Sequence, residues 1–246
     1  MQTLVDFATR FDPRLPERLR PADAAQLAEL ERLCGLRLPP SYADLLMRMG
    51  RNMEWLQPAG RTLRIEPLLA HYRLEPWRPP PGYLKIGLGT QDPFFDIYLR
   101  ARGTPEACVV SLPRGPAADF NIYKRAFRHT LAGTLEEYLG TWVYRTAGLT
   151  RHGHAARLAG QDAANDLLPK VAPVLAGFDL SPVWFSSDWV QVYVGETCGA
   201  IATQFPGGVL SMELAARDAY SLIALQDALS GAISLPHRFA IRGGGI

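Results

Sequence analysis

The sequence predicts an α+β protein made of two parts, residues 1–149 and a smaller α+β region over residues 150–246. Three observations indicate this fold class. Two amphipathic helical stretches lie close together near the start, short runs of β-branched and aromatic residues separated by turn formers follow them, and strand-like and helical stretches alternate again after residue 150. A chain of 246 residues is long enough for two modest domains.

The first helix is expected over residues 22–33. Its apolar residues share one helical stripe; they are Leu27, Leu30 and Leu33. Gly35 can adopt the left-handed backbone angles that end a helix, and Pro39 with Pro40 supplies the fixed φ with which the next helix begins. The sequence therefore predicts a tight helical hairpin.

The second helix follows this turn at once and ends at Gly50. Its apolar residues follow the i, i+3, i+4, i+7 spacing of a buried helical face; they are Tyr42, Leu45, Leu46 and Met49. Beyond it, short antiparallel strands are expected over residues 62–65, 83–88, 94–99 and 108–112. Three successive prolines make residues 78–82 a stiff loop, and residues 89–93 are expected to connect a hairpin.

A helix over residues 134–147 is expected to close the first part. Thr134 and Glu137 have the spacing of a capping box, and Gly148 ends the helix. The domain boundary is expected just beyond, at residues 150–153.

The second part is expected to begin with a helix over about residues 155–168, which breaks near Pro169 and Pro173. Strands over 190–194, 200–205 and 209–214 are separated by turn formers and predict a small meander. Asp218 is expected to cap a helix that carries Leu222, Leu225 and Leu229, and residues 239–241 are expected to add a short edge strand.

Charge and composition argue against a nucleic-acid binder. The formal net charge is +2, with an excess of four basic residues over 1–148 and of two acidic residues over the remainder. The arginines are scattered and form no Lys/Arg run of the kind that binds a polyanion. Hydrophobic residues make up 48% and charged residues 20% of the chain, as in an ordinary soluble globular protein.

The chain carries no spacing typical of a cofactor site. The three cysteines, Cys34, Cys108 and Cys198, lie far apart, which favours a reducing cytoplasm over a metal site or a disulfide framework. Nucleophile elbow, Walker loop and dinucleotide glycine patterns are missing from the sequence. We therefore expect no cofactor, no metal and no catalysis. The sequence has no signal-like start and no apolar run of about 18 residues, so we expect a soluble cytoplasmic protein without a membrane partner.

Residues 20–145 resemble the SUKH superfamily, which is built around a domain of a yeast regulator of cell-wall synthesis. The matching features occur in order; they are Glu31, Gly35, the Leu38-Pro39 step, Tyr42, the Leu45-Leu46 pair, the strands, and the closing segment Thr134–Leu139. The resemblance implies an antiparallel or mixed sheet packed on helices. In bacteria it implies an immunity protein that binds and neutralises a co-encoded toxin, delivered by contact-dependent or type VI secretion.

Candidate partner contacts come from aromatic and acidic residues in or beside loops; they are Trp55, Asp92, Phe94, Phe95 and Asp96. An aromatic side chain in a loop can anchor a partner, although it can equally cover the edge of a sheet. Asp92 and Asp96 can present negative charge to a basic toxin surface, whereas the alternative is a turn acid and a solvated strand position.

Two other functions stay open. One is a scaffold or regulator unrelated to toxins. The other is a hydrolase whose site lies in the C-terminal region, with acid or base candidates at His152, Asp188, Glu196 and His237.

Overall fold

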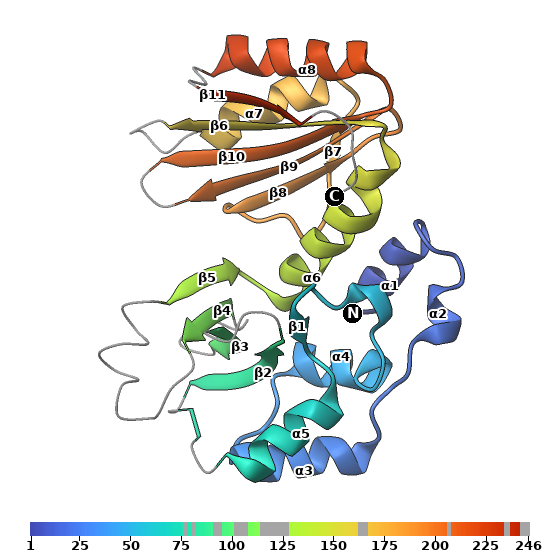
Figure 1. The fold of residues 1–246 in the computed structure, drawn as a ribbon, viewed down its shortest axis with the longest axis vertical. Coiled ribbons are helices and arrows are strands. Elements are labelled where there is room, and N and C mark those ends of the chain that lie inside the picture. Colours follow the sequence, from blue (N-terminus) through green and yellow to red (C-terminus); the bar gives the residue numbers. More distant parts are fainter. Residues whose placement is uncertain are drawn as a thin grey trace. The chain divides into compact units, whose positions relative to one another are not determined.

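The computed structural model describes residues 1–75, 78–79, 82–90, 95–100, 108–113, 128–161, 167–205, 208–233 and, as backbone alone, 237–241. The chain forms two compact units, Met1–Leu139 and Gly140–Ile246 (Figure 1). Both units combine helices with an antiparallel sheet, so the predicted α+β class is confirmed. The division falls inside helix α6 (Leu135–Val143), before the boundary expected between residues 149 and 150.

The first unit contains five strands that pair in sequence order, each antiparallel to the next. They are β1 (Arg61–Thr62), β2 (Tyr83–Gly89), β3 (Phe95–Arg100), β4 (Cys108–Pro113) and β5 (His129–Ala132). The helices before α6 are α1 (Gln2–Thr9), α2 (Leu15–Arg18), α3 (Ala24–Cys34), α4 (Pro40–Met49) and α5 (Ile65–Leu74), with the 3₁₀ turn η1 (Glu54–Leu56) after α4.

The predicted helical hairpin is formed by α3 and α4. Gly35 ends α3 with φ 70°, in the left-handed region that favours glycine. The chain then reverses, and the Glu31 carboxylate accepts a hydrogen bond from the Leu38 backbone N–H at 3.0 Å. Pro40 is the first residue of α4, where a missing N–H costs nothing. Asp23, which the sequence prediction did not include, closes a capping box with Gln26 at the start of α3.

The predicted face of α4 is buried. Tyr42, Leu45, Leu46 and Met49 are each 0% exposed. Gly50 follows them where the chain passes close to its own backbone: a Cβ at this position would lie 2.7 Å from the Leu46 carbonyl oxygen. The Gly50 carbonyl in turn accepts from the Ile65 N–H at 2.8 Å. The end of α4 therefore determines where α5 begins.

Of the strand expected over residues 62–65, only Thr62 lies in a strand, because β1 ends there and α5 begins at Ile65. The buried residues of α5 have helical spacing; they are Ile65, Leu68, Leu69 and Tyr72. The other three expected strands are confirmed as β2, β3 and β4. Of the expected stiff loop, Pro80 and Pro81 lie outside the described residues. Arg78 is described, and its guanidinium donates to the carbonyls of Leu33 and Tyr72, each at 2.6 Å, which ties the ends of α3 and α5 together.

The predicted closing helix is confirmed as α6, which continues in a π-helical turn over Tyr144–Gly148 and a 3₁₀ turn over Leu149–Arg151. Thr134 accepts from the Glu137 N–H at 3.0 Å, as expected for a cap. The Glu137 carboxylate reaches one residue farther back than the capping box requires and accepts from the Gly133 N–H at 2.7 Å.

The six-stranded sheet of the second unit has the order β11-β6-β10-β9-β8-β7, and all its described pairs are antiparallel. Its strands are β6 (His154–Gln161), β7 (Ser181–Pro182), β8 (Val190–Val194), β9 (Cys198–Phe205), β10 (Val209–Ala216) and β11 (His237–Ile241). The predicted meander is confirmed as β8, β9 and β10. Helices α7 (Leu167–Ala176) and α8 (Ala219–Ala232) cover one face of the sheet (Figure 1).

The helix expected over residues 155–168 is wrong. Residues 154–161 form strand β6, in which burial alternates: Ala156, Leu158 and Gly160 are buried and their neighbours are more exposed. The helix starts at Leu167, and the two prolines expected to break it lie within it. Pro169 lies in the first turn, where the N–H is dispensable, whereas Pro173 lies in the interior and cannot donate to the preceding turn.

The core of the second unit lies between the sheet and its two helices. Leu168, Val171 and Leu175 of α7 meet Leu225 and Leu229 of α8 there. Asp218 caps α8 as predicted and accepts from the Ser221 N–H at 2.8 Å. No helix within the described residues is long and apolar enough to cross a membrane.

Replacement of Gly35 by alanine tests whether the hairpin depends on the left-handed turn. A Cβ at Gly35 meets nothing within 4 Å, so the cost is backbone strain alone, about 1 kcal/mol of unfolding free energy. Gly231 in α8 also has open space but lies in a helix, so Gly231→Ala should stabilise by about 0.5 kcal/mol. Urea denaturation measures both. Equal effects of the two substitutions would contradict this explanation of the turn.

Candidate partner-binding surface

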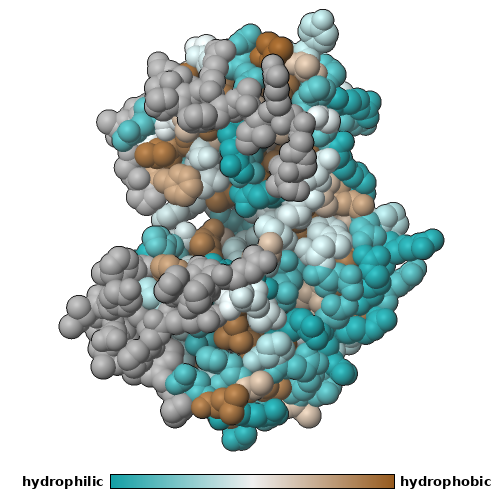
Figure 2. All heavy atoms as spheres, in the orientation of Figure 1, coloured by the Kyte–Doolittle hydropathy of each residue, from teal (hydrophilic) through white to brown (hydrophobic). Residues whose placement is uncertain are grey.

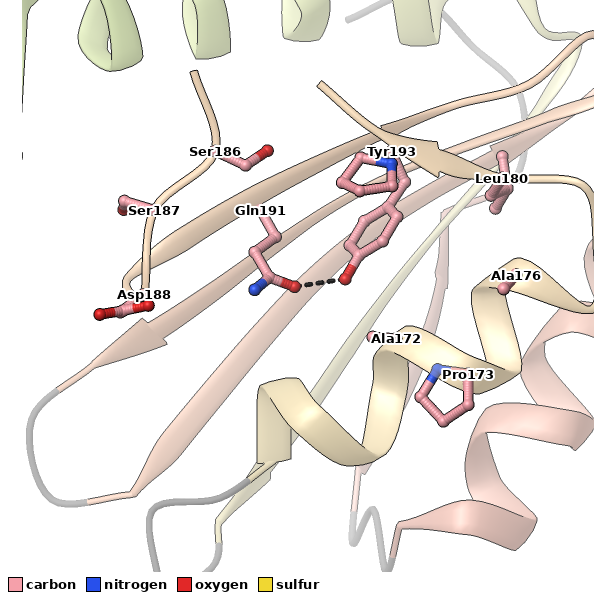
Figure 3. Close-up of a pocket in the computed structure, with 10 residues that line it drawn as sticks. Ala172, Pro173, Ala176, Leu180, Ser186, Ser187, Asp188, Gln191 and Tyr193 are labelled. Atoms are coloured by element: carbon pink, nitrogen blue, oxygen red, sulfur yellow. Dashed lines mark hydrogen bonds between the residues drawn. The ribbon is translucent and has the colours of Figure 1, made fainter. Parts of the chain in front are cut away.

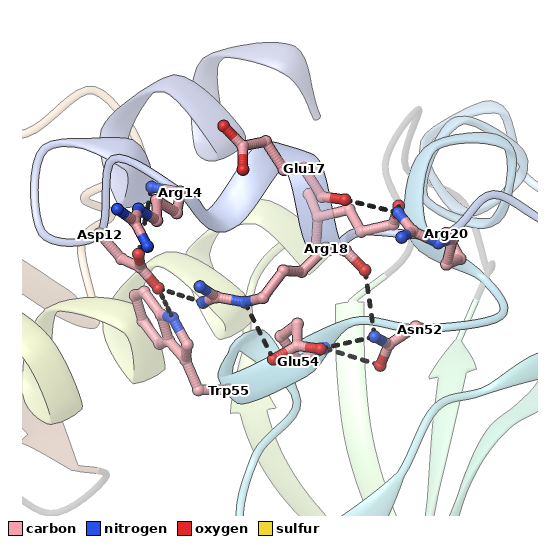
Figure 4. Close-up of polar contacts among 9 residues, drawn as sticks. Asp12, Arg14, Glu17, Arg18, Arg20, Asn52, Glu54 and Trp55 are labelled. Atoms are coloured by element: carbon pink, nitrogen blue, oxygen red, sulfur yellow. Dashed lines mark hydrogen bonds and ion pairs between the residues drawn. The ribbon is translucent and has the colours of Figure 1, made fainter.

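Trp55 lies in η1, directly after the helical hairpin, and its indole ring is half-buried. The indole Nε1–H donates to Asp12 Oδ2 at 3.0 Å (Figure 4). Asp12 belongs to the segment between α1 and α2, and it also accepts a hydrogen bond from the Arg18 guanidinium. The ring is therefore held in one orientation by a charged group from a distant part of the sequence.

Arg18 connects Asp12 to the loop that carries Trp55. Its Nε lies 3.3 Å from Glu54 Oε2, so the guanidinium spans two carboxylates (Figure 4). Asn52 completes the network: its amide donates to Glu54 Oε1 at 2.6 Å and to the Arg18 carbonyl at 3.1 Å. We call Asp12, Arg18, Asn52, Glu54 and Trp55 the Trp55 network.

The backbone at Glu54 is strained. Its φ of 51° lies in the left-handed region, which residues other than glycine seldom adopt. The Glu54 N–H donates to Asn52 Oδ1 at 3.2 Å, and the contacts to its carboxylate hold the side chain on the same network. Strain of this kind persists only where surrounding interactions enforce the conformation. The network therefore presents Trp55 in a conformation fixed before any partner arrives.

The electrostatics of the network keep Asp12 ionised. The hydrogen bond from Arg18, and after it the one from Trp55, lowers the pKa of Asp12 below its ordinary value. A carboxylate accepts from the indole N–H at neutral pH, and a charge-assisted bond of this kind is stronger than a neutral one. Figure 2 shows mostly hydrophilic residues on the surface over α2.

Phe95 starts β3, and its ring is half-buried. It makes an edge contact with the His129 ring at a centroid distance of 5.8 Å, and its carbonyl accepts from Arg61 Nη1 at 2.8 Å. His129 lies on β5, which β4 separates from β3, so the Phe95 ring reaches across one strand of the sheet, and its half-exposed face can meet a partner.

Asp96 is not a surface acid, which corrects the expectation that it presents charge to a partner. Its side chain is 1% exposed, and its Oδ2 lies 3.1 Å from Lys85 Nζ. Residues Asp96–Leu99 are all buried because β3 is covered on both faces, so this strand has no solvated position in its interior. Lys85 is 4% exposed and also lies 2.8 Å from His71 Nε2, while the Gly89 N–H donates to Asp96 Oδ1 at 3.1 Å.

Two of the expected contacts, Asp92 and Phe94, lie outside the described residues. The structure therefore bears on three of the five: Trp55 and Phe95 are partly exposed in the first unit, and Asp96 is buried. Sequence reasoning missed the residues that fix Trp55. Asp12 and Trp55 are 43 positions apart, and no periodic pattern relates the two segments, so the sequence contains no signal that would join them.

The acid and base candidates of the hydrolase alternative lie in different places. Asp188 lies in the loop before β8, Glu196 in the turn after it, and His237 in β11, which is described as backbone alone. His152 is half-buried before β6, and burial, followed by the charges of Arg217 and Arg151, lowers its pKa. No group of three or more His, Cys, Asp and Glu side chains that could hold a metal ion occurs in the part of the chain that the structure describes.

Comparison of the chain with protein-family models and with curated proteins found no match. The resemblance to the SUKH superfamily therefore stays a prediction from the sequence. Several of the residues that suggested it have roles in the fold. Glu31 binds the hairpin backbone, Gly35 reverses the chain, and Tyr42 lies in the core.

The ion pair of Lys85 and Asp96 yields a stability prediction. Asp96→Asn keeps an oxygen for the Gly89 N–H but leaves the buried Lys85 charge without its counter-charge, which should cost about 3 kcal/mol of unfolding free energy. The double variant Lys85→Met/Asp96→Asn removes both charges and should recover at least about 1 kcal/mol of that loss.

An exposed ion pair supplies the control for this experiment. Glu66 pairs with Arg51 at 3.1 Å, with side chains 40% and 56% exposed, so Glu66→Gln should change stability by less than about 0.5 kcal/mol. Urea denaturation of all variants makes the comparison. An Asp96→Asn effect as small as that of Glu66→Gln would show that the pair is not desolvated.

Proposed function

We propose that this protein is an immunity protein that binds a cognate toxin and neutralises it by stoichiometric capture. The observation that carries the proposal is the Trp55 network: a half-exposed aromatic ring held in one orientation by charged side chains. Tryptophan is among the residues that contribute most to protein interfaces, and an anchor ordered beforehand loses little conformational entropy on binding.

The charges around Trp55 support recognition of a protein surface. Both acidic and basic groups lie beside the ring, so the surface can match a mixed pattern on a partner. Such complementarity chiefly sets the rate of encounter and the discrimination between partners, whereas the desolvated aromatic ring supplies affinity. Phe95 is a second aromatic ring available on the same unit.

The identity of the partner as a toxin follows from the SUKH resemblance of residues 20–145. A co-encoded toxin, delivered by a neighbouring cell, is neutralised where it acts, so the proposal includes a cytoplasmic location and no catalytic turnover. The proposal does not depend on which reaction the toxin catalyses. Capture can block the active site of any enzyme or hold the enzyme inactive by steric means.

Trp55→Ala tests the proposal in a complex with the product of the neighbouring gene. Loss of the aromatic anchor should weaken binding by about tenfold or more, measured by isothermal titration calorimetry. Trp184→Ala is the matched control, because Trp184 is also a partly exposed tryptophan, 46% exposed, but lies in the second unit. Circular dichroism of both variants confirms that they fold. Failure of the unmodified chain to bind the neighbouring product, or an unchanged affinity for Trp55→Ala, would contradict the proposal.

A further inference from the structure

The second unit contains a cleft of about 500 Å³ between helix α7 and the edge of its sheet (Figure 3). Ala172, Pro173 and Ala176 of α7 form one wall. The side chains of Gln191 and Tyr193 extend toward α7 from β8 on the opposite side (Figure 3). This cleft is separate from the residues of the Trp55 network, and the inference drawn from it does not depend on the proposed capture of a toxin.

The wall of the cleft is built by the strand period and by a folded-back loop. Residues alternate along β8, so Gln191 and Tyr193 face the helices while Val190 and Val192 face the other side. The loop before β8 runs back beside that strand: the Val183 N–H donates to the Val192 carbonyl at 2.9 Å, and the Ser187 N–H to the Val190 carbonyl at 2.8 Å. The edge of the sheet is thus closed, and the lining residues are held in position.

Most polar groups of the cleft are already engaged within the protein. The Tyr193 hydroxyl donates to Gln191 Oε1, and burial raises the pKa of Tyr193, which keeps that hydroxyl protonated. The Ser187 hydroxyl accepts from the Trp189 and Val190 N–H groups at 3.1 and 3.2 Å, and the Ser186 hydroxyl accepts from the Val192 N–H at 3.0 Å.

Asp188 is the exception. It lines the cleft, its side chain is exposed, and within the described residues its carboxylate has neither a hydrogen-bond donor nor a cationic partner. The Gln191 amide nitrogen lies on the side of the cleft toward Asp188 (Figure 3). An exposed carboxylate beside a cleft, with its polar neighbours already hydrogen-bonded, is available for a ligand.

The charge of the cleft favours a cation. None of the described lining residues is Lys, Arg or His. An anionic ligand would face the Asp188 carboxylate with no basic side chain to offset the repulsion.

The remaining surface of the cleft is apolar and suits an aliphatic chain. Pro173 and Ala176 lie on the helix, and Leu180 and Pro182 lie at the far end, where Pro182 pairs across the sheet edge with Tyr193. Pockets of this kind combine apolar walls with a few polar groups that set orientation. We infer that the cleft binds an organic cation carried on a short aliphatic stem, an alkylguanidinium or alkylammonium group, with its charge at Asp188 and its stem along Ala172, Pro173 and Ala176.

Butylguanidinium and its neutral isostere butylurea test this inference on the full chain. Two-dimensional ¹H–¹⁵N NMR should show saturable shifts at the amides of Ser187, Asp188 and Gln191 with butylguanidinium, an affinity for butylurea that is lower by about threefold, and weaker butylguanidinium binding as salt is added. Equal binding of the two compounds, or shifts confined to other regions, would overturn the inference.

Two substitutions separate charge from shape. Asp188→Asn should reduce butylguanidinium affinity by about threefold, whereas Glu196→Gln, an exposed acid in the turn after β8, should leave it unchanged. Ala176→Phe fills the cleft and should abolish binding of both compounds. Asp188→Asn preserves size and is exposed, so it tests the inference even where Ala176→Phe does not fold. An unchanged affinity of Asp188→Asn would overturn the role of the carboxylate.

The source of the cation is distinguished by a pair of blocked tripeptides, acetyl-Gly-Arg-Gly-amide and its citrulline counterpart. Tighter binding of the arginine peptide than of butylguanidinium supports a partner's side chain as the natural occupant, and tighter binding of butylguanidinium supports a free alkyl cation. Binding of the arginine and citrulline peptides with equal affinity would contradict recognition of the charge.

Discussion

One hydrogen bond, from the Leu38 N–H to the Glu31 carboxylate, holds the turn on which the first unit depends. Gly35 lets the chain leave α3 in the left-handed region, and Pro40 starts α4 without an unsatisfied donor. Between them Leu38 is buried, and its N–H requires an acceptor that the backbone of the turn does not supply. Glu31 supplies it from the preceding helix, so the length of the turn and the rotation of α4 are set together.

Close backbone contacts make the positions of α5 and β2 depend on the orientation of α4. This orientation turns four fully buried side chains into the core and brings Gly50 against the Leu46 backbone, where only glycine fits. The Gly50 carbonyl then receives the first N–H of α5, and Tyr72 near the end of α5 accepts from the Lys85 N–H of β2 at 3.1 Å. The loop that leaves α4 carries Trp55. A rigid scaffold that holds an aromatic ring in one orientation suits a docking surface. The conformational entropy of the ring is lost during folding, so little more is lost on binding.

Local signals made much of the fold predictable. Gly35, Pro39 and the spacing of Tyr42 to Met49 belong to single helices and turns, so the sequence alone places the hairpin. The wrong secondary-structure assignments fall in segments whose residues are compatible with both a strand and a helix. Ile65 ends the alternating run of residues 62–65, which predicts a strand, but it is also the first residue of α5, because Leu68, Leu69 and Tyr72 follow it at helical spacing. Over residues 154–161 the alanines Ala155, Ala156 and Ala159 favour a helix by propensity, yet pairing with β10 and β11 makes a strand.

Site residues were less predictable because their environment depends on tertiary contacts. From the sequence alone, Asp96 is expected at the surface, as most aspartates are. It is buried because Lys85 on the neighbouring strand supplies a counter-charge, and that pairing depends on the tertiary structure. Trp55 was expected at the surface as an aromatic residue in a loop, but its ring is oriented by Asp12, which lies between α1 and α2, and Asp12 is held by Arg18 of α2. No sequence pattern relates these segments to Trp55. Asp188 lines a cleft only because α7 forms the opposite wall, and the sequence prediction placed that helix over residues 155–168 instead of Leu167–Ala176.

The central claim is capture without turnover, and a titration of toxic activity tests it most directly. The purified chain is added stepwise to the product of the neighbouring gene, and residual toxic activity and complex mass are measured together. The account predicts that activity falls in proportion to the chain added and vanishes at a fixed whole-number molar ratio, with both proteins in one complex. Complete loss of activity at a small fraction of an equivalent, or undiminished activity with no complex formed, would contradict it.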